Sequence, residues 1–113
     1  MLESEQTRRF FKVGKASELP ETGCKVFKAG KRNVLIASWE GKLYAIDDRC
    51  THDNGPLGEG TIEQGEVECP RHGARFDIKT GKAVCLPAVG GVPVYSVEIR
   101  DGEIYVGLPT NAP

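Results

Sequence analysis

The stretch that decides the fold runs from residue 50 to residue 72 and reads CTHDNGPLGEGTIEQGEVECPRH. It opens with Cys50-Thr51-His52 and closes with Cys69-Pro70-Arg71-His72, with sixteen residues between the two motifs. The chain contains two histidines and four cysteines, and both histidines and two of the cysteines lie in these motifs. Rare residues would seldom pair in this way by chance, so the stretch predicts a metal site.

The spacing within each motif brings one cysteine and one histidine to the same site. Residues i and i+2 of an extended backbone project on the same side, which places Cys50 beside His52. In the second motif, a turn at Pro70 allows Cys69 and His72 to converge. The four side chains would supply two thiolate sulfurs and two imidazole nitrogens. Such a set could hold one tetrahedral zinc ion, or an iron–sulfur cluster in which two histidines bind one iron.

Two features favour the cluster over zinc. Zinc sites usually take their ligands as Cys-x-x-Cys and His-x-x-x-His pairs, whereas each motif here mixes the two residue types. Glycines also crowd the region, at Gly55, Gly58, Gly60 and Gly73. Glycine permits close backbone approach, and bridging sulfides need backbone N–H donors directed at them. On the residues alone, zinc remains the alternative.

These motifs, with the residues that follow them, resemble those of Rieske-type ferredoxins. The matching residues are Cys50-Thr51-His52, Gly55-Pro56-Leu57, Cys69-Pro70-Arg71-His72-Gly73, Phe76-Asp77 and Thr80-Gly81. The resemblance covers residues 10–108 and is closest to the ferredoxin components of bacterial aromatic-ring-hydroxylating dioxygenase systems. It implies one [2Fe-2S] cluster whose inner iron is bound by Cys50 and Cys69. The outer iron would be bound by His52 and His72.

The rest of the chain predicts an all-β fold, a sandwich or a barrel. Short runs of β-branched and aromatic residues alternate with turns, and no segment has a convincing amphipathic helical pattern. The expected strands cover residues 10–13, 24–28, 33–39, 43–47, 75–77, 82–84, 94–99 and 103–106. Asp101-Gly102 predicts a hairpin turn, and residues 16–19 a short turn ended by Pro20. The resemblance implies that a cluster-binding subdomain, about residues 48–90, is inserted into this scaffold.

Composition narrows the domain count, the partners and the location. The 113 residues suffice for one domain, and we expect residues 1–9 to be frayed. Fifteen basic and sixteen acidic residues give a formal charge of −1, which argues against nucleic acid as a partner. No apolar run approaches the length of a membrane span, and the first residues lack a signal-peptide pattern. We therefore expect a cytoplasmic monomer that does not bind a membrane.

The resemblance implies a one-electron carrier rather than an enzyme, with a ferredoxin reductase and a terminal oxygenase as transient partners. The chain lacks the third histidine and the additional iron site that an oxygenase subunit would need. One alternative is a small electron-entry or regulatory subunit of a nitrite-reductase-like enzyme, but such subunits often lose ligands and all four are present here. Another alternative is an interaction module stabilised by zinc.

Acidic residues concentrate around the motifs, whereas basic residues precede them. Residues 47–68 contain seven acidic residues and one basic residue, while residues 1–33 contain eight basic and four acidic residues. The acidic run is either an ordinary solvated face or a collar that orients a basic partner during a brief encounter.

Departures from the family's high-potential members imply a low redox potential. Those members carry an extra cysteine in each ligand loop, whereas Asp53-Asn54-Gly55 and Arg71 occupy the corresponding positions here. The serine and tyrosine hydroxyl groups that they place near the cluster have no match in residues 73–76. Fewer hydrogen bonds to sulfur leave the reduced state less stabilised, so we expect a negative potential.

The remaining features have simpler interpretations. Residues 86–93 resemble the family's proline loop, which covers one side of the cluster, although a plain connection between strands is the alternative. Cys24 and Cys85 lie outside the motifs. We expect Cys24 to be a small buried residue and no disulfide to join it to Cys85. Trp39 and Tyr44 are expected to be packing residues.

Overall fold

The computed structural model describes residues 8–49, 57, 60–69, 73–85 and 90–109. The longer strands are β1 (Arg8–Lys15), β2 (Gly23–Ala29), β3 (Arg32–Trp39), β4 (Lys42–Asp47), β9 (Val94–Arg100) and β10 (Glu103–Pro109). The shorter strands are β5 (Thr61–Glu63), β6 (Glu66–Glu68), β7 (Arg75–Asp77) and β8 (Ala83–Cys85). A 3-10 helix, η1 (Ala16–Glu18), follows β1 where the sequence predicts a short turn. The all-β prediction is confirmed.

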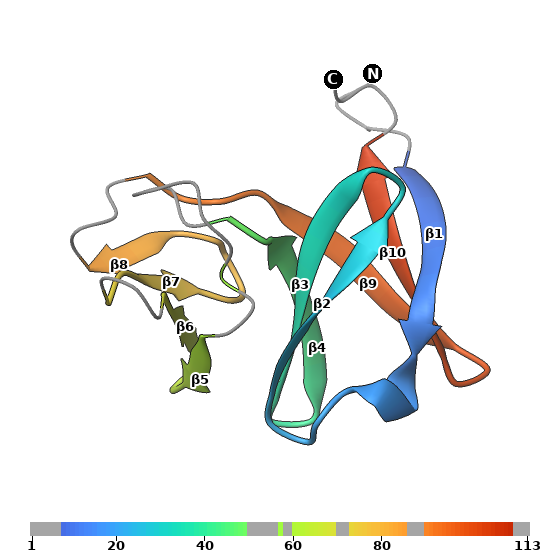
Figure 1. The fold of residues 1–113 in the computed structure, drawn as a ribbon, viewed down its shortest axis with the longest axis horizontal. Helices are drawn as coiled ribbons and strands as arrows, with labels where there is room; N and C mark the ends of the chain where they lie inside the picture. Colours follow the sequence, from blue (N-terminus) through green and yellow to red (C-terminus); the bar gives the residue numbers. More distant parts are fainter. Residues whose placement is uncertain (1–7, 50–56, 58–59, 70–72, 86–89, 110–113) are drawn as a thin grey trace.

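The strands form two antiparallel sheets that lie beside one another (Figure 1). The larger sheet has the order β1-β10-β9-β4-β3-β2, and the smaller sheet has the order β5-β6-β7-β8. The larger sheet curls so that its edge strands, β1 and β2, approach each other. They lie so close that a Cβ added to Gly14 of β1 would be 2.6 Å from the ring of Phe27 on β2. The curled sheet therefore has the shape of a nearly closed barrel.

The smaller sheet is an insertion between two neighbouring strands of the larger one. The chain leaves the larger sheet at the end of β4 and returns to it at β9. These two strands pair through Ala45 with Tyr95 and through Ile46 with Val94. A backbone hydrogen bond of 3.0 Å from Asp47 N to Pro93 O continues the pairing. The scaffold thus holds both ends of the inserted segment side by side.

Strand β3 contributes to two separate hydrophobic cores. Successive residues of a strand point to opposite faces of a sheet, and β3 is buried on both. Val34 and Ile36 belong to the core enclosed by the curled sheet, with Ala45, Ile104 and Val106 among its other members. The neighbouring residues of β3 belong to a second core that joins the two sheets, whose buried members are Leu35, Ala37, Ile46, Leu57, Val67, Cys69, Ala74, Phe76, Ile78 and Val92. The smaller sheet therefore completes its core with residues of the larger one.

Three two-residue turns have the backbone of type I′ hairpins. Glu40, Gln64 and Asp101 have φ values of 53°, 53° and 50°, and the glycine after each also has positive φ. Such turns suit the right-handed twist of paired strands and favour glycine at the second position. The turn at Asp101-Gly102 is as predicted, and Glu40-Gly41 lies between the strands expected at residues 33–39 and 43–47. The third, Gln64-Gly65, joins β5 to β6 in a hairpin that was not predicted.

The structure also moves several strand boundaries, and the last strand, β10, extends three residues beyond its expected end. Strand β1 begins at Arg8 rather than Phe10, because Arg8 and Arg9 pair with Pro109 and Leu108 of β10. Residues 8 and 9 are therefore part of the sheet and not of a frayed end. Strand β8 covers residues 83–85, one residue later than expected.

Candidate metal centre

One of the four predicted ligands, Cys69, lies within the described residues. Cys50, His52 and His72 lie outside them, so the convergence of the four side chains stays a prediction. Cys69 directly follows β6 and is 1% exposed, within the core that joins the two sheets. A buried cysteine at the end of a paired strand fits the inner ligand of a cluster, because its sulfur is shielded from water and its backbone is fixed.

The backbone on either side of residues 70–72 is tied together. Cys69 N donates a hydrogen bond of 2.7 Å to Ala74 O, and Gly73 N donates one of 3.0 Å to Cys69 O. Gly73 has a φ of +77°, in the left-handed region that glycine adopts without strain. The segment that carries His72 therefore leaves and returns at the same point. The glycine after the Cys-x-x-His motif is needed for this turn.

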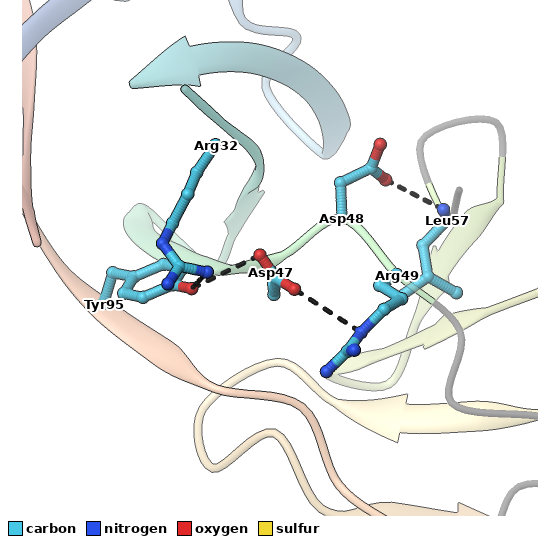
Figure 2. Close-up of polar contacts among 6 residues, drawn as sticks. All are labelled: Arg32, Asp47, Asp48, Arg49, Leu57 and Tyr95. Atoms are coloured by element: carbon cyan, nitrogen blue, oxygen red, sulfur yellow. Dashed lines mark hydrogen bonds and ion pairs between the residues drawn. The ribbon is translucent and has the colours of Figure 1, made fainter. Parts of the chain in front are cut away.

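A second pair of contacts fixes residues 47–49, which we call the root of the segment that carries Cys50 and His52. Asp48 Oδ1 accepts a hydrogen bond of 2.8 Å from Leu57 N (Figure 2). Asp48 N donates one of 3.1 Å to Asn33 O on β3. Leu57 itself is fully buried. Both ends of this segment are thus anchored to the scaffold, as are those of the segment that carries His72.

A polar network on the other side of the same root includes Asp47 and Tyr95 (Figure 2). Tyr95 Oη donates a hydrogen bond of 3.3 Å to Asp47 Oδ1 and accepts one of 3.5 Å from Arg32 Nη1. Arg49 Nε lies 3.6 Å from Asp47 Oδ2. Burial raises the pKa of Tyr95, and the negative charge of Asp47 raises it further. Tyr95 therefore stays a neutral phenol whose O–H donates a hydrogen bond to the carboxylate of Asp47.

This network was not predicted from the sequence. The signal available was the pair Asp47-Asp48, which follows an apolar strand and is separated from the Cys-x-His motif by Arg49 alone. Their partners Tyr95 and Leu57 are 48 and nine residues away along the chain, and no local pattern identifies them.

Three members of the acidic run surround one arginine. Arg75 of β7 lies 2.9 Å from Glu63, 3.6 Å from Glu66 and 3.7 Å from Glu68, measured between nitrogen and carboxylate oxygen. Arg75 and Glu68 are opposite one another in the pairing of β6 with β7. The negative charge of this sheet is partly neutralised by an arginine that lies outside the acidic run in the sequence. Surface pairs of this kind contribute little to stability.

Of the predictions for residues outside the motifs, the packing of Trp39 and Tyr44 is confirmed, and the burial of Cys24 is confirmed only in part. Cys24 is half-buried rather than buried, and its Sγ lies 3.7 Å from Gly60 O. Burial raises the pKa of Cys24, so it remains protonated at neutral pH. Trp39 and Tyr44 pack against the core that joins the two sheets. Trp39 also covers Gly65 and lies 5.3 Å, from ring centroid to Nζ, beneath Lys79. The side chain of Cys85 and most of the predicted proline loop, residues 86–89, lie outside the described residues.

Two kinds of feature are absent from the described part of the chain. Within it, no three histidine, cysteine, aspartate or glutamate side chains are grouped as a metal ion would require. The same residues include no helix with the length and apolar character to cross a membrane.

Comparison with known proteins identifies the family. The model of the Rieske [2Fe-2S] domain matches residues 9–96. The 3-phenylpropionate/cinnamic acid dioxygenase ferredoxin subunit of Escherichia coli (strain K12) is 47% identical over 81 residues, which are 71% of this chain and 76% of that protein.

Solved structures give the same result. The ferredoxin of carbazole 1,9a-dioxygenase from Nocardioides aromaticivorans IC177 superposes with a TM-score of 0.81 at 30% identity, over 86% of this chain and 95% of that chain. A chain in the complex of reduced oxygenase and oxidized ferredoxin in carbazole 1,9a-dioxygenase has a TM-score of 0.75 at 35% identity, over 86% of this chain and 91% of that chain.

The family decides between the alternatives that the sequence left open. Its [2Fe-2S] cluster suits two thiolates and two imidazoles, so the prediction of an iron–sulfur centre is confirmed and zinc is excluded as the resident metal. The relatives are ferredoxins, which supports the electron carrier and not the nitrite-reductase-like subunit. The chain belongs to the Rieske [2Fe-2S] family and is a ferredoxin, an electron-transfer component that holds one Rieske-type cluster rather than a catalytic oxygenase.

Proposed function

We propose that this ferredoxin passes single electrons from a ferredoxin reductase to the terminal oxygenase of an aromatic-ring dioxygenase system. The observation that carries the proposal is the similarity to ferredoxin subunits of such systems, together with a related ferredoxin solved in complex with its oxygenase. The partners form brief complexes, because a carrier must leave one before it meets the other, which requires a small interface and fast exchange. We place the carrier in the cytoplasm as a monomer.

The ligand set of this proposal is Cys50 and Cys69 on the inner iron, and His52 and His72 on the outer one. A bound [2Fe-2S] cluster supplies the one-electron chemistry. Cys69 is held in the core between the sheets, and the turn at Gly73 brings the chain back beside it. The segment with Cys50 and His52 starts and ends on the scaffold at Asp48 and Leu57. These anchors restrict movement of the ligands, which favours fast electron transfer because little structure must reorganise.

We further propose a low redox potential. Two neutral imidazoles leave the site less negative than four thiolates would, which raises the potential above the roughly −400 mV of plant-type ferredoxins. No extra cysteines stand in the ligand loops to form the disulfide of high-potential members. The midpoint should lie nearer about −150 mV than zero.

The test is a reconstitution with purified components. The ferredoxin should be brown-red, bind about two iron atoms per chain and take up one electron in a redox titration. Added to an aromatic-ring dioxygenase and its reductase, it should support substrate oxidation that stops when it is omitted. Failure to pass electrons to any such oxygenase while remaining reducible would contradict the partner proposal. A clearly positive midpoint would contradict the proposed potential.

A further inference from the structure

The carboxylates of Asp47 and Asp48 hold the root of the segment that carries Cys50 and His52, and they do so from different sides. Strand β4 ends at Asp47 and the chain turns at Asp48, where Arg49 N donates a hydrogen bond of 2.9 Å to Asp47 O. Figure 2 shows Asp47 directed toward Tyr95 and Asp48 directed toward Leu57. Asp47 therefore joins the root to β9 of the larger sheet, whereas Asp48 joins it to the point where the segment ends.

Leu57 is held by its side chain, its carbonyl oxygen and its N–H. Its side chain is fully buried in the core that joins the sheets. Its carbonyl oxygen accepts a hydrogen bond of 2.8 Å from Gly60 N, and its N–H donates one of 2.8 Å to Asp48 Oδ1. Asp48 thus bridges the start of the segment to an immobile end point.

We propose that Asp48 is a positioning residue for the metal centre. Its carboxylate fixes the separation between residues 48 and 57, and with it the geometry available to the segment that contains Cys50 and His52. The inference rests on the proposed ligand set, because it matters only if those two residues bind iron. The function of Asp48 is geometric: an oxygen acceptor is required at the position of Oδ1, and the charge is secondary.

Three substitutions separate geometry from charge. Asp48→Asn keeps an acceptor oxygen at the same position and removes the charge. Asp48→Glu keeps the charge and moves the oxygen farther from the backbone by one methylene group, and Asp48→Ala removes both. Asp77→Ala is the matched control, because Asp77 Oδ1 also accepts backbone hydrogen bonds, of 2.7 Å from Lys79 N and 3.2 Å from Thr80 N, on an exposed turn of the smaller sheet.

The measurements are the EPR signal of the reduced holoprotein and the rate at which a chelator removes its iron. We expect Asp48→Ala and Asp48→Glu to shift or broaden the EPR signal and to accelerate iron loss roughly tenfold. Asp48→Asn should stay within about threefold of the wild type. Asp77→Ala should match the wild type in both measurements.

Two results would overturn the proposal. The first is that Asp48→Ala and Asp48→Glu behave like Asp77→Ala. The second is that Asp48→Asn fails as Asp48→Ala does, since charge and not geometry would then be responsible. If Asp48→Ala does not fold, Asp48→Asn and Asp48→Glu still distinguish the position of the acceptor oxygen from its charge. A His52→Ala variant tested in parallel separates failure of the ligand set from failure of the role of Asp48. An unchanged cluster spectrum in His52→Ala would refute the ligand set, whatever the Asp48 variants do.

Discussion

The larger and the smaller sheet of this ferredoxin differ in how they are stabilised. The strands of the larger sheet are six to eight residues long, and they enclose a core of their own. Each strand of the smaller sheet has three residues, and its core is completed by Leu35, Ala37 and Ile46 of the larger sheet.

The difference shows how the two tasks of the molecule are divided. Stability comes from long strands with many paired residues. Metal binding is assigned to the smaller sheet and its neighbouring segments, whose ends are fixed by hydrogen bonds such as those of Asp48 with Leu57 and of Cys69 with Ala74. The smaller sheet should therefore depend on the larger one and on the cluster, whereas the larger sheet should fold independently of the metal.

The largest effect should follow from removing a ligand. Cys69→Ser preserves the size of a fully buried side chain but replaces the soft thiolate, so the iron content should fall at least about tenfold. Cys24→Ser is the matched control, since Cys24 also packs against the core that joins the sheets and lies outside the motifs. Metal analysis and visible absorption measure both. A Cys69→Ser protein that retains the full cluster would refute the assignment of Cys69.

The next test uses neighbouring residues of β3 that face different cores. Leu35 and Ile36 are both fully buried, so Leu35→Ala and Ile36→Ala should each lower the free energy of unfolding by about 2–5 kcal/mol. Only Leu35→Ala should also accelerate the release of iron to a chelator, because only Leu35 packs against the smaller sheet. Denaturant titration gives the first quantity and chelation kinetics the second. Equal acceleration in both variants would mean that the two cores are not separate.

A smaller effect is expected at two glycines with nearly the same backbone. Gly73 and Gly41 have φ values of +77° and +78°. Among the described residues, an added Cβ at Gly73 would lie 3.6 Å from Glu68 Oε2 as its nearest neighbour, and one at Gly41 would meet no atom within 4 Å. Replacing either by alanine should therefore cost the strain of the left-handed conformation, about 1–2 kcal/mol. Gly73→Ala should in addition weaken retention of the cluster, because the turn beside Cys69 would relax. If Gly41→Ala weakened retention of the cluster equally, the turn at Gly73 would have no specific role in holding the metal centre.

The smallest effect concerns Tyr95 at high pH. The pKa of Tyr95 is raised in the folded protein above its ordinary value of 10.0, first by burial and then by the charge of Asp47. The unfolded chain therefore loses this proton at lower pH than the folded protein does. The stability that Tyr95 contributes is complete below about pH 10 and is lost as the pH rises from there through the folded pKa. Unfolding measured from pH 8 to 11 should show a shallower alkaline loss in Tyr95→Phe than in the wild type; identical slopes would contradict the role of this phenol.

The sequence was sufficient where structure follows from local patterns. The continuous apolar run of β3 predicted that strand within one residue, because burial on both faces leaves a direct mark on residue choice. The Asp101-Gly102 turn predicted the end of β9 and the start of β10 within one residue, because positive φ favours glycine, whereas β10 continues three residues beyond its expected end. The hairpin of β5 and β6 was missed because its strands are only three residues long, although Gln64-Gly65 carries the same turn signal as Glu40-Gly41.

The candidate site was predictable only in its ligands. Cysteine and histidine are rare and chemically specific, so their spacing identified the donor set. The contacts that support it were not predictable, because aspartate before a ligand motif has no unique partner. Leu57 and Tyr95 become partners of Asp48 and Asp47 only once β4 and β9 are paired and the inserted segment has returned to the core.

The most direct test of the ligand assignment uses the fact that His52 and His72 are the two histidines of the chain. Protein without an affinity tag of histidines, grown with ¹⁵N-histidine, carries that label in these two residues alone. Pulsed EPR of the reduced protein should then show two ¹⁵N nuclei strongly coupled to the unpaired electron. A spectrum with one strongly coupled ¹⁵N nucleus, or with none, would contradict the assignment of both imidazoles to the outer iron.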